Sequence, residues 1–221
     1  MHGLDLLWHE IDRFLGGLAD ADGGVARTRM RLGEMADLRR LPATIPPASP
    51  TCGSYKEALA AAVIGPAAEL AQALGNIDLH WISYNAYAAD TIGTLFPRRH
   101  AYTSLIAAAD PDWARDFDIG FLLIAPGTLY RDHHHLASEL YVPLTGPTYW
   151  RFGTTAPWAE KMPGETVWNP PHRVHATLVR DMPLLCLYAW TENVHAPAKV
   201  EFSPDWREIE AALAHQEGVI L

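Results

Sequence analysis

Residues 127–146 read GTLYRDHHHLASELYVPLTG. In an extended strand, side chains two positions apart point to the same face. His133, His135, Glu139 and Tyr141 all have odd numbers, so extended backbone would direct them to one side, with His134 facing away. Two imidazoles, a carboxylate and a phenol on one wall suit a borderline divalent metal such as Zn²⁺, Fe²⁺ or Mn²⁺.

The spacing in this stretch is similar to that of the first sequence motif of the cupin superfamily, G-x5-H-x-H-x3-E-x6-G. The five specified positions fall on the ligand candidates and on the glycines at either end of the stretch. At ordinary residue frequencies such a match arises by chance about once in 10⁶ starting positions. The resemblance implies a cupin barrel, which is a double-stranded β-helix of jelly-roll type.

A second stretch resembles the second cupin motif, G-x5-P-x-G-x2-H-x3-N. Gly164, Pro170 and His175 fit it, whereas His172 replaces the usual glycine and Val179 the common asparagine. Neither departure removes a metal ligand. The resemblance implies that four residues hold one divalent transition metal ion (Zn, Fe or Mn): His133, His135, Glu139 and His175. Such a set leaves coordination positions open, as is typical of catalytic metals.

The rest of the chain predicts helices followed by strands. Residues 1–75 are expected to form a helical cap, because apolar residues recur there at helical spacing. Residues 76–221 are expected to form the barrel, closed by a short helix over 205–215, so the fold class is mainly β with α. The expected strands cover 79–87, 102–107, 119–125, 140–143, 148–152, 165–168, 174–179 and 184–190.

Composition narrows the class of partners. The 17 basic and 26 acidic residues give a net charge of −9, which disfavours nucleic acid. No apolar run reaches the roughly 20 residues that a membrane span needs. Two cysteines cannot form a disulfide framework, and the first ten residues lack a signal-peptide pattern. The expected location is the cytoplasm.

The run His-x-His-x3-Glu-x-Tyr, with Tyr130 just upstream, resembles the cupin-type dimethylsulfoniopropionate (DMSP) lyases of marine bacteria. In that family a helical region precedes one cupin barrel. The resemblance implies that DMSP, a small zwitterion, is cleaved to acrylate and dimethyl sulfide. It also implies that Tyr141 is the catalytic tyrosine and that Tyr130 and Trp190 contact the substrate.

These residues suit the chemistry of β-elimination. A bound metal offsets the negative charge that develops on the substrate carboxylate. A cation close to Tyr141 favours its tyrosinate form, which can act as the base. Aromatic rings attract a sulfonium group by cation–π interaction. The candidates are Tyr130, Tyr149, Trp150, Tyr188 and Trp190, although each could instead be a plain core residue.

Three readings of function stay open at this point. The chain is a metal-dependent carbon–sulfur lyase, another metal-dependent cupin enzyme such as a dioxygenase or isomerase, or a cupin that binds a small ligand without catalysis. A tyrosine beside the metal is required by the first reading and not by an oxygenase. Cupins often pair, so a homodimer is as compatible with the sequence as a monomer.

Overall fold

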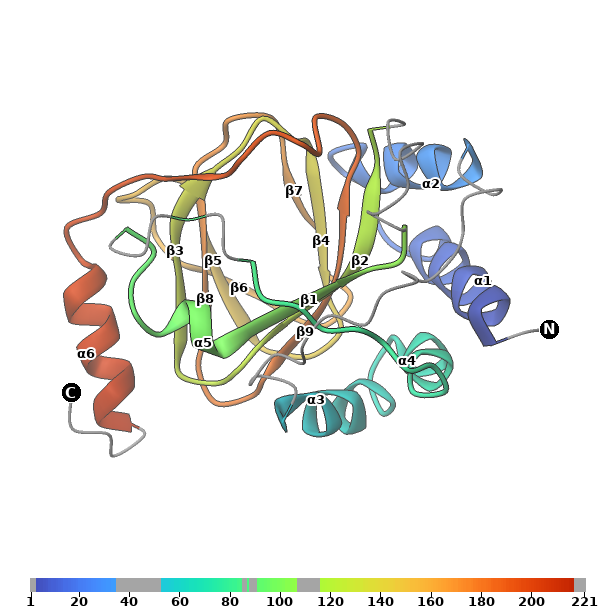
Figure 1. Ribbon diagram of the computed structural model, residues 1–221, viewed down its shortest axis with the longest axis horizontal. Coiled ribbons are helices and arrows are strands. Elements are labelled where there is room, and N and C mark those ends of the chain that lie inside the picture. The colour runs from blue at the N-terminus through green and yellow to red at the C-terminus, as the bar shows by residue number, and fades with distance from the viewer. Residues whose placement is uncertain (1–2, 35–52, 85–86, 88–90, 107–115, 217–221) are drawn as a thin grey trace.

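Two five-stranded antiparallel sheets face each other in the computed structural model, which describes residues 3–34, 53–84, 87, 91–106 and 116–216 (Figure 1). The first sheet has, in spatial order, β1 (His100–Ser104), β2 (Asp118–Ile124), β9 (Leu184–Trp190), β4 (Glu139–Pro143) and β7 (Val167–Asn169). The second has β10 (Lys199–Val200), β3 (Thr128–His134), β8 (His175–Val179), β5 (Thr148–Arg151) and β6 (Ala159–Lys161). This is the predicted cupin barrel.

The first sheet is buried on both faces. Along β2, Phe121 and Leu123 pack outward while Leu122 and Ile124 pack into the space between the sheets. This explains why β2 reads as an unbroken apolar run instead of an alternating one. The inward face contributes Tyr141, Tyr188 and other aromatic side chains to the inter-sheet cluster.

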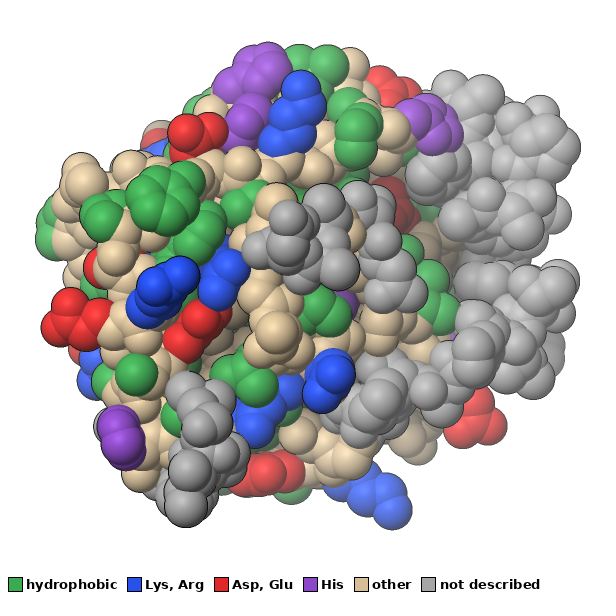
Figure 2. All heavy atoms as spheres, turned by 60° about the vertical axis from the view of Figure 1, so that its left-hand side comes forward, with side chains coloured by type: hydrophobic (Ala, Val, Ile, Leu, Met, Phe, Trp, Pro, Cys, Tyr) green, Lys and Arg blue, Asp and Glu red, His purple; other side chains and the backbone are tan. Residues whose placement is uncertain are grey.

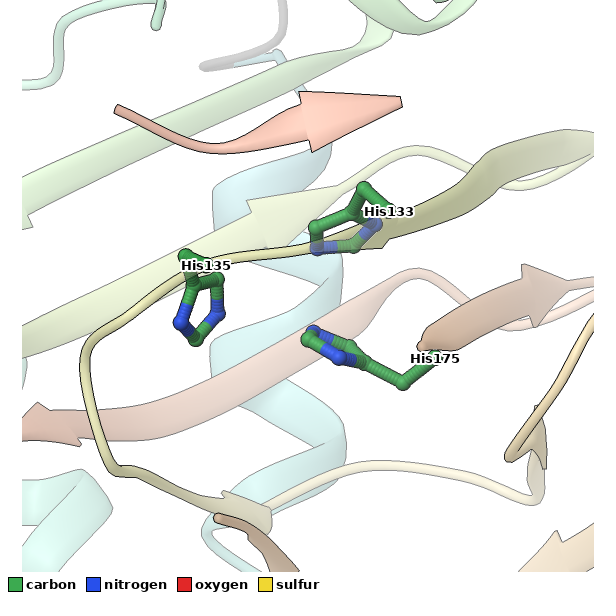
Figure 3. A group of neighbouring side chains, drawn as sticks. All are labelled: His133, His135 and His175. Atoms are coloured by element: carbon green, nitrogen blue, oxygen red, sulfur yellow. The ribbon is translucent and has the colours of Figure 1, made fainter. Parts of the chain in front are cut away.

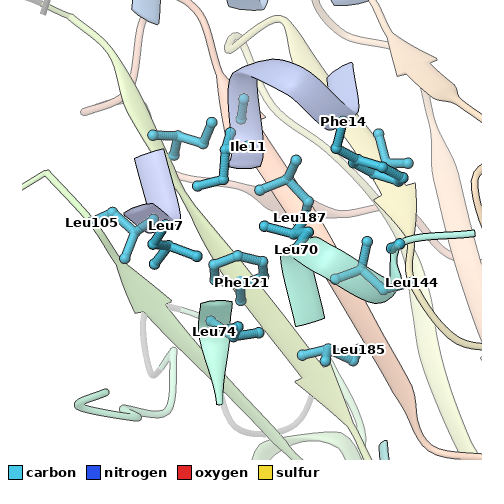
Figure 4. Close-up of a cluster of buried hydrophobic side chains, with 14 of the residues drawn as sticks. Leu7, Ile11, Phe14, Leu70, Leu74, Leu105, Phe121, Leu144, Leu185 and Leu187 are labelled. Atoms are coloured by element: carbon cyan, nitrogen blue, oxygen red, sulfur yellow. The ribbon is translucent and has the colours of Figure 1, made fainter. Parts of the chain in front are cut away.

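Four helices cover the outer face of the first sheet: α1 (Gly3–Gly16), α2 (Gly24–Glu34), α3 (Tyr55–Ala62) and α4 (Ala68–Leu74). The predicted apolar stripe of α1 is buried there through Leu7, Ile11 and Phe14. Figure 4 shows these side chains meeting residues of α4 and of the sheet. The N-terminal helices therefore share one hydrophobic core with the barrel.

Helix α6 (Trp206–Gln216) packs on the outer face of the second sheet. The guanidinium of Arg151, only 1% exposed, donates to Asp132 at 2.9 Å and to Asp205 at 3.0 Å. Trp206 donates its indole N–H to Asp132 at 2.7 Å. The start of the helix is thus tied to β3 by a buried ion network.

Some predicted elements differ from the structure. Of the strand expected over 79–87, the described residues show only an isolated bridge at Ile82. Within the helical stretch expected over 56–74, Pro66 was expected to open a new helix, and the structure has a break there between α3 and α4, with α4 beginning at Ala68. Met30 is 59% exposed, because α2 buries Val25 and Leu32 instead. Strands β3, β6 and β10 and the short helix α5 (Phe96–Arg99) were not expected. Residues 35–52 of the expected helical cap lie outside the described residues.

No helix in the described part of the chain is long and apolar enough to cross a membrane. On the face drawn in Figure 2, acidic and basic side chains are interspersed. The described residues on that face therefore form no broad field of one sign. The expectations of a cytoplasmic location and of no nucleic-acid partner stay predictions.

Candidate metal centre and its surroundings

Three histidines converge between the two sheets. His133 lies on β3, His135 just after it, and His175 is the first residue of β8. One ring nitrogen from each lies within 4.8 Å of the others, and all three residues are buried. Figure 3 shows the three rings turned toward a common centre.

The orientation of each ring is fixed by a backbone carbonyl. A carbonyl oxygen can only accept, so the facing Nδ1 must carry the proton and Nε2 of a neutral ring keeps its lone pair. His133 and His175 are therefore held in the tautomer that coordinates through Nε2. Burial works to lower the pKa of His135, but the Glu139 carboxylate, 2.9 Å from its Nε2, outweighs burial and raises that pKa, so this nitrogen donates to the carboxylate when no metal is bound. The Nδ1-to-oxygen distances are 2.8 Å from His133 to Arg131, 2.9 Å from His135 to Ala137 and 2.9 Å from His175 to Arg173.

Two of the three Nε2 atoms keep a lone pair that accepts no hydrogen bond from the described residues. Among the described residues, nothing hydrogen-bonds Nε2 of His133 or Nε2 of His175, although both atoms are buried. Burial, together with the neighbouring His175 and His135, holds the pKa of His133 well below its usual range. A neutral, buried imidazole with a free lone pair is an energetic cost unless a cation occupies the site. The arrangement fits a divalent metal ion.

Glu139 reaches this cluster from the opposite sheet. Its Oε2 atom lies 2.9 Å from Nε2 of His135 and 3.4 Å from Nε2 of His175. Its Oε1 atom accepts a hydrogen bond of 2.5 Å from the indole N–H of Trp190. Burial works to raise the pKa of Glu139, but His135 and His175 outweigh it and hold the pKa well below its usual range. The carboxylate is therefore ionised and can act as a fourth ligand.

A β-bulge brings Tyr130 into the same space. The register between β3 and β8 shifts between Tyr130 and His133, so residues of opposite parity both face inward. The rings of Tyr130 and His133 stack with their centroids 4.0 Å apart. The Tyr130 hydroxyl is 2.5 Å from that of Tyr87, whose ring meets His133 edge to face.

The inner face of the first sheet supplies the remaining aromatic residues. Tyr141 and Tyr188 are cross-strand partners on β4 and β9. Glu139 and Trp190, two residues away on the same strands, form another such pair. Burial and the negative charge of Glu139 raise the pKa of Tyr141 well above its usual value. Tyr141 is thus protonated in the metal-free protein, beside the ligand cluster, with its ring centroid 6.3 Å from that of His175.

Tyr149 is not brought to this space. It pairs with Leu178 on β8 and packs with Trp206 of α6 on the outer face of the second sheet. The Arg180 guanidinium lies over its ring, 4.6 Å from the centroid. Its neighbour Trp150 faces inward instead, 5.1 Å from the ring of Tyr141. The alternation of β5 thus puts the predicted Tyr149 on the wrong side for substrate.

Three residues near the site were not singled out from the sequence. Tyr87 lay inside a predicted strand, and Asp118, which accepts a 2.9 Å hydrogen bond from Tyr188, begins β2. Asn169 faces Glu139 across β7 and β4. Asn169 directly precedes Pro170 of the second motif. It lies two residues after Val167, so in a strand the two side chains share a face, and this spacing was the signal in the sequence that could have identified Asn169.

A family model described as dimethylsulfoniopropionate lyase matches residues 27–186. The chain belongs to the dimethylsulfoniopropionate lyase family. The matched region contains all three histidines of the cluster, together with Glu139 and Tyr141. The family is one of carbon–sulfur lyases, which agrees with the resemblance first seen in the histidine-rich stretch.

A curated relative agrees with this assignment. A Cereibacter sphaeroides protein, provisionally named dimethylsulfoniopropionate lyase DddL, is 30% identical over 157 residues. That alignment covers 69% of this chain and 63% of the relative, so the chain spans less than two thirds of the relative's length.

The solved structures are similar in fold. One, from crystal structures of the DMSP lyases RdDddP and RnDddQII, is 16% identical with a TM-score of 0.60, covering 90% of this chain and 98% of the other. DddQ of Ruegeria pomeroyi is 19% identical with a TM-score of 0.54, covering 81% and 98%. At these identities the likeness concerns the fold.

Proposed function

We propose that this protein cleaves DMSP by metal-dependent β-elimination to acrylate and dimethyl sulfide. One observation carries the proposal: a member of the DMSP lyase family holds three buried histidines, each with a ring nitrogen within 4.8 Å of the others. A substrate carboxylate is a ligand that such an open site accepts.

His133, His135, His175 and the Glu139 carboxylate would hold one Zn, Fe or Mn ion. When bound, the ion supplies Lewis-acid chemistry, because it polarises the substrate carboxylate and offsets the negative charge that raises the pKa of Tyr141. The residues themselves do the positioning. The carbonyls behind each Nδ1 fix the rings, and the Trp190 indole fixes the Glu139 carboxylate.

Tyr141 would remove the proton from the carbon next to the carboxylate. The C–H electron pair becomes the new carbon–carbon double bond, and the C–S pair leaves with sulfur as neutral dimethyl sulfide. The proton then passes from the Tyr141 hydroxyl to water, which restores the base. Support for this role is the position of Tyr141 two residues from Glu139, on the inner face of β4.

An aromatic wall would take the sulfonium end of the substrate. Tyr130, Tyr188 and Trp190 line the inter-sheet space near the histidines. Their faces attract a cation without hydrogen-bonding it, which suits a sulfonium group that has no donor. Tyr149 is left out of this proposed wall because it lies on the outer face of the sheet.

Proton NMR of the reaction mixture tests the reaction type. Metal-loaded protein incubated with DMSP should produce the vinyl signals of acrylate in step with loss of the sulfonium methyl signal. Formation of 3-hydroxypropionate in place of acrylate would indicate hydrolysis and would contradict elimination. Unchanged DMSP in the presence of folded, metal-loaded protein would contradict the substrate.

A further inference from the structure

Asn169 carries an unsatisfied amide inside the barrel. The residue is the last of β7 and is 0% exposed. Neither its Nδ2 nor its Oδ1 atom has a hydrogen-bond partner among the described residues. A buried amide without partners is unfavourable, because no hydrogen bond offsets its loss of hydration. Such a group persists when a ligand completes its hydrogen bonds.

Two other buried polar side chains of the barrel, Thr145 and Arg151, are fully hydrogen-bonded by contrast. The Thr145 hydroxyl donates to the Pro183 carbonyl at 2.7 Å and accepts from the Leu185 N–H at 2.7 Å. The Arg151 guanidinium is held by two carboxylates. In contrast, the unpartnered atoms of the inter-sheet space are Nε2 of His133 and His175 and the carboxamide of Asn169, counting only residues that the structure describes.

The carboxamide lies on the same side of the first sheet as the metal cluster. Asn169 is the cross-strand partner of Glu139, and directly opposed side chains have Cβ atoms about 5 Å apart. Val167, two residues earlier on β7, belongs to the inter-sheet cluster, so Asn169 shares its inward face. The free amide therefore faces the space beside the candidate ligands.

We propose that Asn169 is a substrate-binding residue whose Nδ2 donates a hydrogen bond to the substrate carboxylate. The inference rests on the proposed function for the identity of the substrate. DMSP has no N–H or O–H donor, so the only partner it offers an amide is its carboxylate, an acceptor. The amide is neutral, so it binds an anion without competing for the metal site, and water can donate to its Oδ1 atom.

The test is binding of propionate, which carries the carboxylate and no sulfonium group. Zinc-loaded wild-type protein and Asn169→Leu are titrated with propionate and followed by ligand-observed NMR. Loss of one charge-assisted hydrogen bond should weaken binding by about tenfold or more. The melting temperature should stay the same or rise, because leucine has the same branching and the same number of side-chain heavy atoms and leaves no amide unsatisfied.

Three controls separate substrate binding from structure. Thr145→Val removes a buried polar group that is satisfied by the protein, so it should lower the melting temperature and leave propionate affinity unchanged. Zinc content of Asn169→Leu should equal that of wild type. Binding of propionamide, which is uncharged, should be less affected by Asn169→Leu than binding of propionate. If Asn169→Leu does not fold, Asn169→Ser, which keeps a donor on a shorter side chain, replaces it and should also weaken propionate binding.

Equal propionate affinity in wild type and variant would overturn the proposal, and so would loss of zinc from the variant. Undetectable binding of propionate to wild type would overturn it as well. The titration measures binding without turnover, so its result does not depend on whether the protein cleaves DMSP. Weakened propionate binding without any dimethyl sulfide release would overturn the reaction and leave the role of Asn169 standing.

Discussion

The Oε2 atom of Glu139 lies 2.9 Å from Nε2 of His135, although His135 follows β3 of one sheet and Glu139 begins β4 of the other. Only three residues separate His135 from Glu139, and the chain passes from one sheet to the other between them. The cluster formed by the three histidines and Glu139 therefore also connects the two sheets of the barrel. Occupancy of the centre should couple to stability, because a metal that binds only the folded state stabilises it by mass action.

Removal of a ligand should lower metal content. We expect His175→Ala and Glu139→Ala to lose metal affinity by more than the roughly 10–100-fold typical of outer residues, because they remove a direct ligand. The matched control is His134→Ala, whose ring lies beside His172 and Glu201 and not in the cluster. Elemental analysis after equilibrium dialysis measures the difference. Equal metal content in all three variants would contradict the ligand assignment.

Replacement of Tyr141 by phenylalanine should abolish most turnover and leave metal content unchanged. The change removes only the hydroxyl, and loss of a general base costs typically 10²–10⁴-fold in rate, so we expect a loss of about 10²-fold or more. Tyr149→Phe makes the same chemical change on the outer face of the second sheet and should keep near-normal activity. Steady-state rates of acrylate formation compare the two. Near-normal turnover by Tyr141→Phe would remove Tyr141 as the base.

Acid should destabilise the fold through His100, away from the metal centre. Burial lowers its pKa to about 4. Its Nδ1 donates to the Phe96 carbonyl at 2.7 Å, and its Nε2 accepts from the Tyr84 N–H at 2.9 Å, so the bond to Tyr84 requires the neutral ring. Below about pH 6.5 the unfolded chain binds the proton and the folded chain does not, so the free energy of unfolding falls until about pH 4.

The size of this effect is on the order of 3 kcal/mol between those two pH values. Urea denaturation of the metal-free protein across this range measures it. The His100→Gln variant keeps a donor and an acceptor but does not titrate, so its stability should fall less steeply with acid. The same pH dependence in the variant and in wild type would show that His100 is not responsible.

The buried network under α6 should be costly to break. Arg151→Met leaves the Asp132 carboxylate buried without its main cation, and losing one partner of a buried pair typically costs about 3–5 kcal/mol. Arg29→Ala removes an exposed ion pair with Asp12 and should cost less than about 1 kcal/mol. Chemical denaturation compares the two. A similar, small loss in both variants would mean that the network does not hold the helix.

The motifs predicted the fold and the clustering of the three histidines, because each motif spans a short stretch of chain within which the spacing of the candidate ligands is fixed. His133 and His135 lie within one bend of chain, and Pro170 starts the turn that leads to His175. The odd residue numbers of His133, His135, Glu139 and Tyr141 predicted that these side chains lie together, but for an incorrect reason. The prediction assumed one continuous strand from His133 to Tyr141, whereas β3 ends at His134 and the chain changes sheets before Glu139.

Long-range relationships could not be predicted in this way. The bulge that turns Tyr130 inward depends on how β3 pairs with β8, and pairing joins residues far apart in sequence. The outward position of Tyr149 follows from β5 lying in the second sheet beneath α6. Asn169 is conspicuous only because its amide lacks partners, which composition and spacing cannot reveal.

The most direct test of the account is headspace gas chromatography for dimethyl sulfide. Purified protein is incubated with DMSP as isolated, after chelation, and after Zn²⁺, Fe²⁺ or Mn²⁺ is added back. We predict fast release that is lost on chelation and returns with at least one metal. Absence of release with every metal, from folded and metal-loaded protein, would contradict DMSP cleavage, and release that survives complete metal removal would contradict the role of the three histidines.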